Sequence, residues 1–288
     1  MFSFLGNVKV GDSLPVRIMG TINLSPESFY KGSIAIKEGQ ILKKASAMIE
    51  QGADLLDVGA YSTAPYLNTR ISKEEEIKRI ERALRVIREV DRNIAISVDT
   101  FRAEVAERAF YFDAQVINDV TGLEDRMIAR VVREHDGSLI IMAYDPDGKR
   151  KDKPLKRIVK ALRASLAIAE EEGIDKRRIV LDPGIGFFRE EGRGPAFSKQ
   201  KVMPWYLWDI QVIRNLRILK RLGFPVCLSL SRKSFIGKVL GIENPEERLF
   251  GSIGATVIAV EKGANIIRTH DVMETVQAVR MAEAIIRS

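Results

Sequence analysis

Cysteine and histidine are scarce in this chain of 288 residues, which holds only Cys227, His135 and His270. A single cysteine excludes an intramolecular disulfide, and so few cysteines and histidines argue against a zinc site of the usual kind. No run reaches the roughly 18 apolar residues that a membrane-spanning helix needs, and the N-terminus has no long apolar leader. We therefore expect a cytoplasmic protein with Cys227 buried as a structural thiol.

A basic stripe with interleaved aromatic residues, typical of nucleic-acid-binding surfaces, is also absent. The net charge of +7 comes from 46 basic and 39 acidic residues. Many of the basic residues share a helical pattern with glutamates, as in 73–85, which is typical of a solvated face. The charge therefore favours anionic small molecules as ligands over nucleic acid or a membrane.

Short apolar runs, each followed by a helical pattern, divide the chain into eight similar units. The helical patterns end at residues such as Gly52, and the second one opens at Ser72 with Glu75 three positions on, a capping box. We expect helices over 36–51, from 72, over 102–112, 125–135, from 154, over 206–222, from 234 to 262 and from 273. We expect strands over 16–22, 55–59, 94–99, 115–119, 138–142, 179–182, 226–230 and 265–268.

This alternation predicts an α/β fold, a single (β/α)8 TIM barrel over residues 1–288. Near-continuous apolar strands suit a parallel sheet that helices cover. A doubly wound open sheet is the alternative. It needs fewer strands, and it typically has a glycine-rich phosphate turn after the first strand, which this chain lacks.

Polar residues follow the predicted strands at the point where each strand ends. In a barrel these ends meet at one mouth. Carboxylates and amides there suit the edge of a flat heterocycle, since a carboxylate accepts two adjacent N–H groups. Arg268 and His270 would form a donor-rich corner for phosphate beside Asn23, whose amide oxygen can bind a hard cation. The strand-end residues are Asn23, Thr63, Asp99, Asn118, Met142, Asp182, Lys233, Arg268 and His270.

Each strand-end residue also has a purely structural interpretation. Asp99 or Asp182 could cap the helix that follows, and Asn118 could serve a turn. Met142 and Phe187 could be packing residues, and the cationic side chains could simply be solvated. These alternatives stay open at the level of single residues.

Seven motifs resemble, in order, the successive signatures of the dihydropteroate synthase family of pterin-binding barrels. They span almost the whole chain, which makes the likeness specific. The motifs are MGTINLSPESF, GADLLDVGAYSTAP, SVDT, INDV, LDPGIGF, SRKSFIG and EKGANIIRTHDV.

The resemblance implies an enzyme that joins a dihydropterin-CH2-pyrophosphate to the amine of p-aminobenzoate and releases pyrophosphate, with Mg2+ as cofactor. It implies that Lys233, Arg268 and His270 carry the chemistry. Dimers are common among members of the family, so a homodimer is a candidate assembly. It places the pterin on Asp99, Asn118, Met142, Asp182 and Lys233. Pyrophosphate and metal fall to Asn23, Arg268 and His270, and the arylamine to Thr63, Phe187, Lys233 and Ser234.

The chain departs from the family pattern at three places. Ala64 stands where the family has an arginine thought to close over the substrates, and Lys31 stands where the family has an acid. The segment 188–203 is longer than a normal strand-to-helix loop. It carries the basic residues Arg189, Arg193, Lys199 and Lys201.

The long basic segment leaves two interpretations open: a solvated loop, or a site for a larger arylamine that carries a ribose phosphate, as in methanopterin-type pathways. Two other function classes remain. One is pterin-dependent methyl transfer to a corrinoid protein, which has no need of the motifs SRKSFIG and RTHDV. The other is a non-catalytic pterin-binding protein, which the loss of the arginine at Ala64 would favour.

Overall fold

Eight parallel strands form a barrel at the centre of the molecule. The computed structural model describes residues 1–26, 32, 34–65, 70–148 and 152–288. Strand order in the sheet is β11-β12-β3-β4-β5-β6-β7-β8, and a bridge between Leu181 and Val226 joins the two outermost strands. The strands are β3 (Arg17–Asn23), β4 (Leu55–Gly59), β5 (Ala95–Asp99), β6 (Val116–Asp119), β7 (Ser138–Met142), β8 (Ile179–Asp182), β11 (Cys227–Ser229) and β12 (Ile266–Thr269).

The predicted TIM barrel is thus confirmed, and the doubly wound alternative is wrong. Every residue of β4, β5 and β7 is buried, because helices cover the outer face of these strands and side chains fill the inside. Cys227, at 1% exposure, is buried as predicted.

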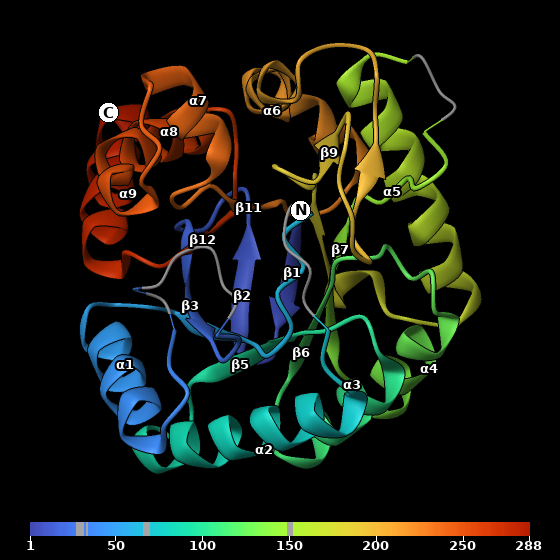
Figure 1. Cartoon of the computed structure of the whole chain (residues 1–288), viewed down its shortest axis with the longest axis vertical. Coiled ribbons are helices and arrows are strands. Elements are labelled where there is room, and N and C mark those ends of the chain that lie inside the picture. Colours follow the sequence, from blue (N-terminus) through green and yellow to red (C-terminus); the bar gives the residue numbers. More distant parts are fainter. Residues whose placement is uncertain (27–31, 33, 66–69, 149–151) are drawn as a thin grey trace.

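Helices surround the barrel on its outside (Figure 1). The predicted cap of the second helix is confirmed, since Ser72 Oγ accepts the Glu75 N–H at 3.2 Å. No helix in the described ranges is long and apolar enough to cross a membrane. The helices are α1 (Glu38–Glu50), α2 (Lys73–Val90), α3 (Ala103–Tyr111), α4 (Arg126–Glu134), α5 (Pro154–Glu171), α6 (Trp205–Arg214), α7 (Ser234–Leu240), α8 (Leu249–Glu261) and α9 (Val272–Arg287).

Two helix predictions were wrong in their extent. The helix expected over 206–222 ends at Arg214, and a 3-10 segment, η3 (Leu216–Leu222), follows it. The helix expected from 234 to 262 is two helices, because Gly241 ends α7 in the left-handed region at φ 70°. A 3-10 turn, η4 (Pro245–Glu247), lies between them.

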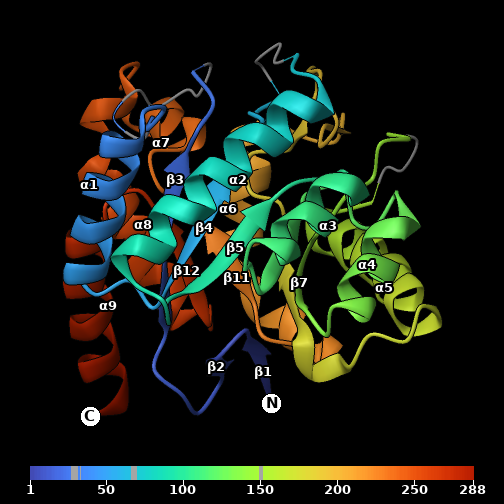
Figure 2. The same ribbon diagram turned by 90° about the horizontal axis from the view of Figure 1, so that it is seen from below.

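An N-terminal hairpin, absent from the sequence prediction, closes one end of the barrel. Its strands β1 (Phe2–Leu5) and β2 (Val8–Gly11) pair antiparallel. Leu5 and Val10 pack on residues from the beginnings of the barrel strands, such as Met19 and Leu55. Figure 2 shows the hairpin below the barrel strands, at the end away from α7. The other end, where the strands finish, is left for a site.

We expect Leu5→Ala to lower the free energy of unfolding by about 2–5 kcal/mol, because it leaves a cavity under the barrel. Leu5 is 0% exposed, whereas Leu42 on α1 is 44% exposed. Leu42→Ala is therefore the matched control, with an expected change within about 0.5 kcal/mol. Urea denaturation of both variants measures the difference, and equal losses would contradict a closing role for the hairpin.

Candidate active site

One pocket lies at the carboxyl ends of the barrel strands, and every site residue predicted from the sequence lines it. These residues are Asn23, Thr63, Asp99, Asn118, Met142, Asp182, Phe187, Lys233, Ser234, Arg268 and His270. The barrel therefore brings together side chains that lie up to about 250 positions apart in the chain. The pocket is also lined by residues beyond the predicted site residues, among them Tyr61, Ala64, Arg189, Ser229 and Ser231.

Arg268 is held at the floor of the pocket by two carboxylates. Its Nε donates to Asp57 Oδ2 at 2.7 Å, and its Nη2 lies 2.6 Å from Asp57 Oδ2 and 3.2 Å from Asp99 Oδ2. Burial lowers the pKa of Arg268, but these two carboxylates outweigh it and raise the pKa above the ordinary value. The guanidinium is therefore fixed in place and charged.

Asp57 is a residue that the sequence prediction missed. It lies inside β4 and is 0% exposed, whereas the prediction considered only the residues at strand ends. A carboxylate within a fully buried strand needs a charged or hydrogen-bonding partner. That requirement was the signal in the sequence, although nothing in the sequence names Arg268 as the partner.

The two predicted pterin carboxylates are buried and cap no helix. The N-cap of α3 is Arg102 and that of α6 is Pro204, so the capping interpretation of Asp99 and Asp182 is wrong. Burial raises the pKa of Asp99 to about 7, against the nearby Arg268 charge. Burial also raises the pKa of Asp182, whose Oδ1 accepts the Gly184 N–H at 2.7 Å.

Lys233 lines the pocket immediately before α7. Its Nζ donates to the Ile185 carbonyl at 2.5 Å and lies 4.7 Å from the centroid of the Phe187 ring. Burial lowers the pKa of Lys233 to about 8, opposed by the carboxylates of Asp182 and Asp209. Asp209, on α6, was not predicted; its Oδ1 accepts the Gly186 N–H at 2.9 Å and so holds the turn after β8.

His270 lies at the end of β12 and carries no charge at neutral pH. Burial, helped by the positive charges of Arg268 and Lys44, lowers the pKa of His270 to about 3. Its contribution to the donor-rich corner is therefore a neutral imidazole, and the positive charge there comes from Arg268.

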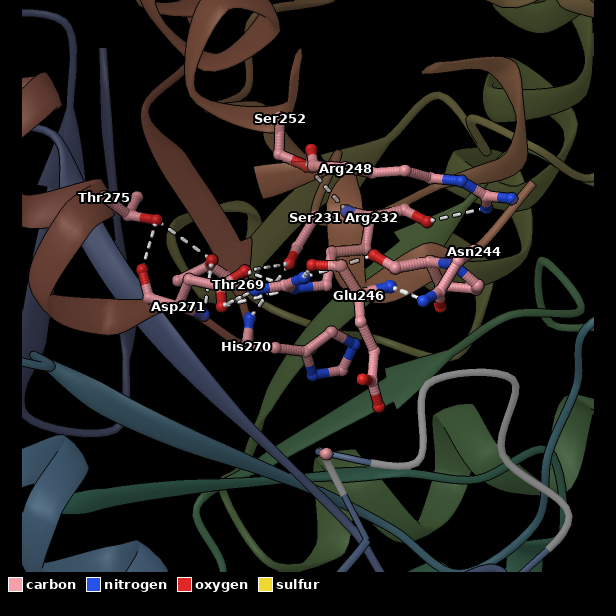
Figure 3. A network of polar contacts seen from close by, with 12 residues as sticks. Ser231, Arg232, Asn244, Glu246, Arg248, Ser252, Thr269, His270, Asp271 and Thr275 are labelled. Carbon is pink, nitrogen blue, oxygen red and sulfur yellow. Dashed lines mark hydrogen bonds and ion pairs between the residues drawn. The ribbon is translucent and has the colours of Figure 1, made fainter. Parts of the chain in front are cut away.

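A buried ion pair ties together the two loops that carry Lys233 and His270. Arg232 Nη2 lies 2.7 Å from Asp271 Oδ1, and its Nε donates to Asp271 Oδ2 at 2.9 Å. Figure 3 shows this pair beside His270, with Arg232 also donating to the Glu246 carbonyl at 2.6 Å. Arg232 has φ 56°, an unfavourable region for a side chain of its size, so the surrounding contacts must hold it there.

The basic segment after Phe187 is ordered against the site and is not a solvated loop throughout. Within it, β9 (Phe188–Arg189) pairs in parallel with β10 (Ser198–Lys199). Of its four basic residues only Arg189 lines the pocket, while Arg193, Lys199 and Lys201 are exposed. Lys31, where the chain departs from the family pattern, lies outside the described residues.

The described residues provide no ready-made metal cage. No group of three His, Cys, Asp or Glu side chains among them could hold a metal ion. Asn23, the predicted metal ligand, lines the pocket together with Arg268 and His270.

The sequence matches known proteins over nearly its whole length. A family model described as pterin binding enzyme matches residues 19–270. The chain is 36% identical to the dihydropteroate synthase of Bacillus subtilis, over 93% of this chain and 88% of that protein. It is 35% identical to that of Clostridium beijerinckii, over 94% of each. The chain belongs to the dihydropteroate synthase family.

Solved structures of this family share the barrel. The dihydropteroate synthase of Clostridium difficile, determined in the presence of pteroic acid, superposes with a TM-score of 0.81 at 36% identity, covering 95% of this chain and 98% of that one. The Xanthomonas albilineans dihydropteroate synthase in complex with 7,8-dihydropteroate gives a TM-score of 0.82 at 30% identity, covering 100% of both chains. The chain is thus an enzyme of the dihydropteroate synthase type, a transferase.

We expect Asp271→Asn to destabilise this dihydropteroate synthase-type barrel by about 3–5 kcal/mol, because it leaves the buried Arg232 guanidinium without its charged partner. The side chains of this pair are 7% and 10% exposed. Glu104→Gln is the control, since its pair with Lys73 is 55% and 47% exposed. That exposed pair contributes at most about 1 kcal/mol. Chemical denaturation compares the free energies of unfolding of the two variants. A smaller loss for Asp271→Asn than for Glu104→Gln would contradict a stabilising role for the buried ion pair.

Proposed function

We propose that this chain condenses a dihydropterin-CH2-pyrophosphate with the amine of p-aminobenzoate. The amine nitrogen forms a bond to the CH2 carbon, the carbon–oxygen bond to pyrophosphate breaks, and the nitrogen gives up a proton. The observation that carries the proposal is the pocket at the strand ends, which joins acidic, cationic and aromatic side chains and is lined by residues from all eight barrel strands or their loops. Relatives solved with pteroic acid and with 7,8-dihydropteroate support it.

The pterin would lie on the acidic side of this pocket. Asp182 and Asn118 offer oxygen acceptors for the N–H groups along the edge of the ring. Met142, 2% exposed, would pack on the ring face, and Lys233 would donate to a ring acceptor. Asp99, beside Arg268, would stabilise the positive charge that develops on the ring as the pyrophosphate departs.

The pyrophosphate would lie in the corner formed by Asn23, Arg268 and His270. Nε and Nη2 of Arg268 already donate to carboxylates, so Nη1 is the group proposed for a phosphate oxygen. Mg2+ is proposed to enter with the substrate. The amide oxygen of Asn23 would be its protein ligand, and pyrophosphate and water would supply the others. When bound, the ion neutralises charge on the leaving group.

The arylamine would lie against Thr63, Phe187, Lys233 and Ser234. Plain p-aminobenzoate is favoured over an amine bearing a ribose phosphate, because Arg193, Lys199 and Lys201 are exposed and do not line the pocket. A relative from Xanthomonas albilineans was solved with 4-aminobenzoic acid. Methyl transfer to a corrinoid protein is disfavoured, because that reaction would not need the part of the pocket formed by Lys233 and Ser234.

We further propose that two copies of the chain associate in the cytoplasm. Large apolar side chains are exposed on α8 and α9, including Phe250 at 86%, Met281 at 64% and Ile285 at 69%. The two helices lie side by side (Figure 1), so a second copy could cover both. Sedimentation equilibrium with the wild type and Phe250→Asp tests this association.

Pyrophosphate release tests the proposed activity. Wild-type protein is mixed with dihydropterin pyrophosphate, Mg2+ and either p-aminobenzoate or its ribose-phosphate derivative. We expect release with p-aminobenzoate and a lower kcat/KM with the derivative. We expect Asp182→Asn to abolish tight pterin binding. Tight pterin binding without release from either amine would instead identify a non-catalytic binding protein.

We expect kcat/KM for p-aminobenzoate to fall as the pH rises through about 8. Lys233, whose pKa burial lowers to about 8, is charged below that pH and loses its charge above it. The pH profile of kcat/KM reports the pKa values of groups in the free enzyme. The basic limb of that profile therefore reports Lys233 before substrate binds. Lys233→Arg should move the limb to higher pH, because a guanidinium stays protonated over the whole pH range of the assay. A limb that stays in place would show that another group titrates.

A further inference from the structure

We infer that Arg189, acting through Ser234, sets how strongly the pocket binds the carboxylate of p-aminobenzoate. The inference rests on the proposed function and adds to it a residue that reads the far end of the arylamine. Arg189 would not be a catalytic residue; it would position and polarise the hydroxyl that meets the substrate.

Arg189 is the one buried cation that the segment 188–203 brings to the pocket. It is 8% exposed and lines the pocket together with Ser234 and Lys233. Its Nη2 donates to Ser234 Oγ, and its Nε donates to the Gly186 carbonyl at 2.9 Å. The centre of the guanidinium lies 4.0 Å from the centroid of the Trp205 ring. These contacts hold the guanidinium of Arg189 so that its N–H donors face the Ser234 hydroxyl.

The contact with Arg189 determines what Ser234 can offer a ligand. A guanidinium is only a donor, so Ser234 Oγ must accept from it and must direct its own O–H elsewhere. The nearby positive charge also makes that O–H a stronger donor. Ser234 lies on the pocket wall, so the hydroxyl is set to donate to an anionic oxygen of the bound molecule.

The surroundings match the anionic end of an arylamine. Phe187 supplies an aromatic face with the Lys233 ammonium 4.7 Å from its centroid, and Lys233 is followed directly by Ser234. Arg189 contacts the Ser234 hydroxyl, and Lys233 brings a second cation to the same pocket beside the Phe187 ring. Because the other basic residues of segment 188–203 are exposed, this end has charge for one compact anion and not for an additional phosphate.

Steady-state kinetics with two amines tests the inference. The amines are p-aminobenzoate and 4-aminobenzamide, which differ in charge and hardly in shape. For Arg189→Gln we expect the KM for p-aminobenzoate to rise about 10- to 100-fold, as for the loss of a hydrogen bond involving a charged group. The KM values for 4-aminobenzamide and for dihydropterin pyrophosphate should change less than about threefold. Arg189→Lys should recover part of the loss, and Lys201→Gln, an exposed charge in the same segment, should have no effect.

A double-mutant cycle with Ser234→Ala tests whether the two residues act together. We expect the effect of Arg189→Gln on p-aminobenzoate to be much smaller in the Ser234→Ala background. An equal rise in KM for both amines, or a loss of pterin binding, would overturn the inference and show a structural role. Fully additive effects would also overturn it. Wild-type protein that released no pyrophosphate from either amine would instead contradict the proposed function.

Discussion

The ion pairs of Arg268 with Asp57 and Asp99 are the interaction on which the site depends. A guanidinium and two carboxylates stand inside the barrel, where an unpaired charge would cost several kcal/mol. They come from β12, β4 and β5, and β12 and β4 both pair with β3. The strands must therefore adopt their observed register for any of the three charges to be satisfied. The same register sets a charged floor beneath the pocket.

The pocket wall around Lys233 also depends on buried charges that act on one another. Burial disfavours the charge on Lys233, while Asp182 and Asp209 favour it, and the balance leaves the pKa of Lys233 at about 8. The buried ion pair between Arg232 and Asp271 joins the loop that carries Lys233 to the loop that carries His270. The site thus consists of a fixed floor and a wall whose charge responds to pH in the neutral to basic range. Such a division suits a reaction in which the protein orients two rings and compensates phosphate charge.

The barrel could be predicted from the sequence because its signals are local and repeated. Each apolar run of about five residues followed by a helical pattern identified a strand and its helix, and Ser72 with Glu75 identified a cap. The prediction failed where local pattern and tertiary packing differ. The run 234–262 contains no proline until Pro245, yet Gly241 in the left-handed region ends α7. The hairpin of β1 and β2 is too short to identify by periodicity. It packs on the beginnings of the eight barrel strands, and that surface exists only once the barrel has formed.

The sequence by itself determined which chemical groups this protein brings to its site, because the carboxyl ends of parallel strands must meet at one mouth. Asp99, Asn118, Asp182, Lys233 and Arg268 follow from that rule together with the family motifs. Only the tertiary structure decided how those groups are charged and paired. Asp57 is hidden within a strand, and Arg189 reaches Ser234 across 45 positions. Partners so distant in the chain leave no periodic trace, and the extent of burial, which sets each pKa, exists only once the barrel has closed.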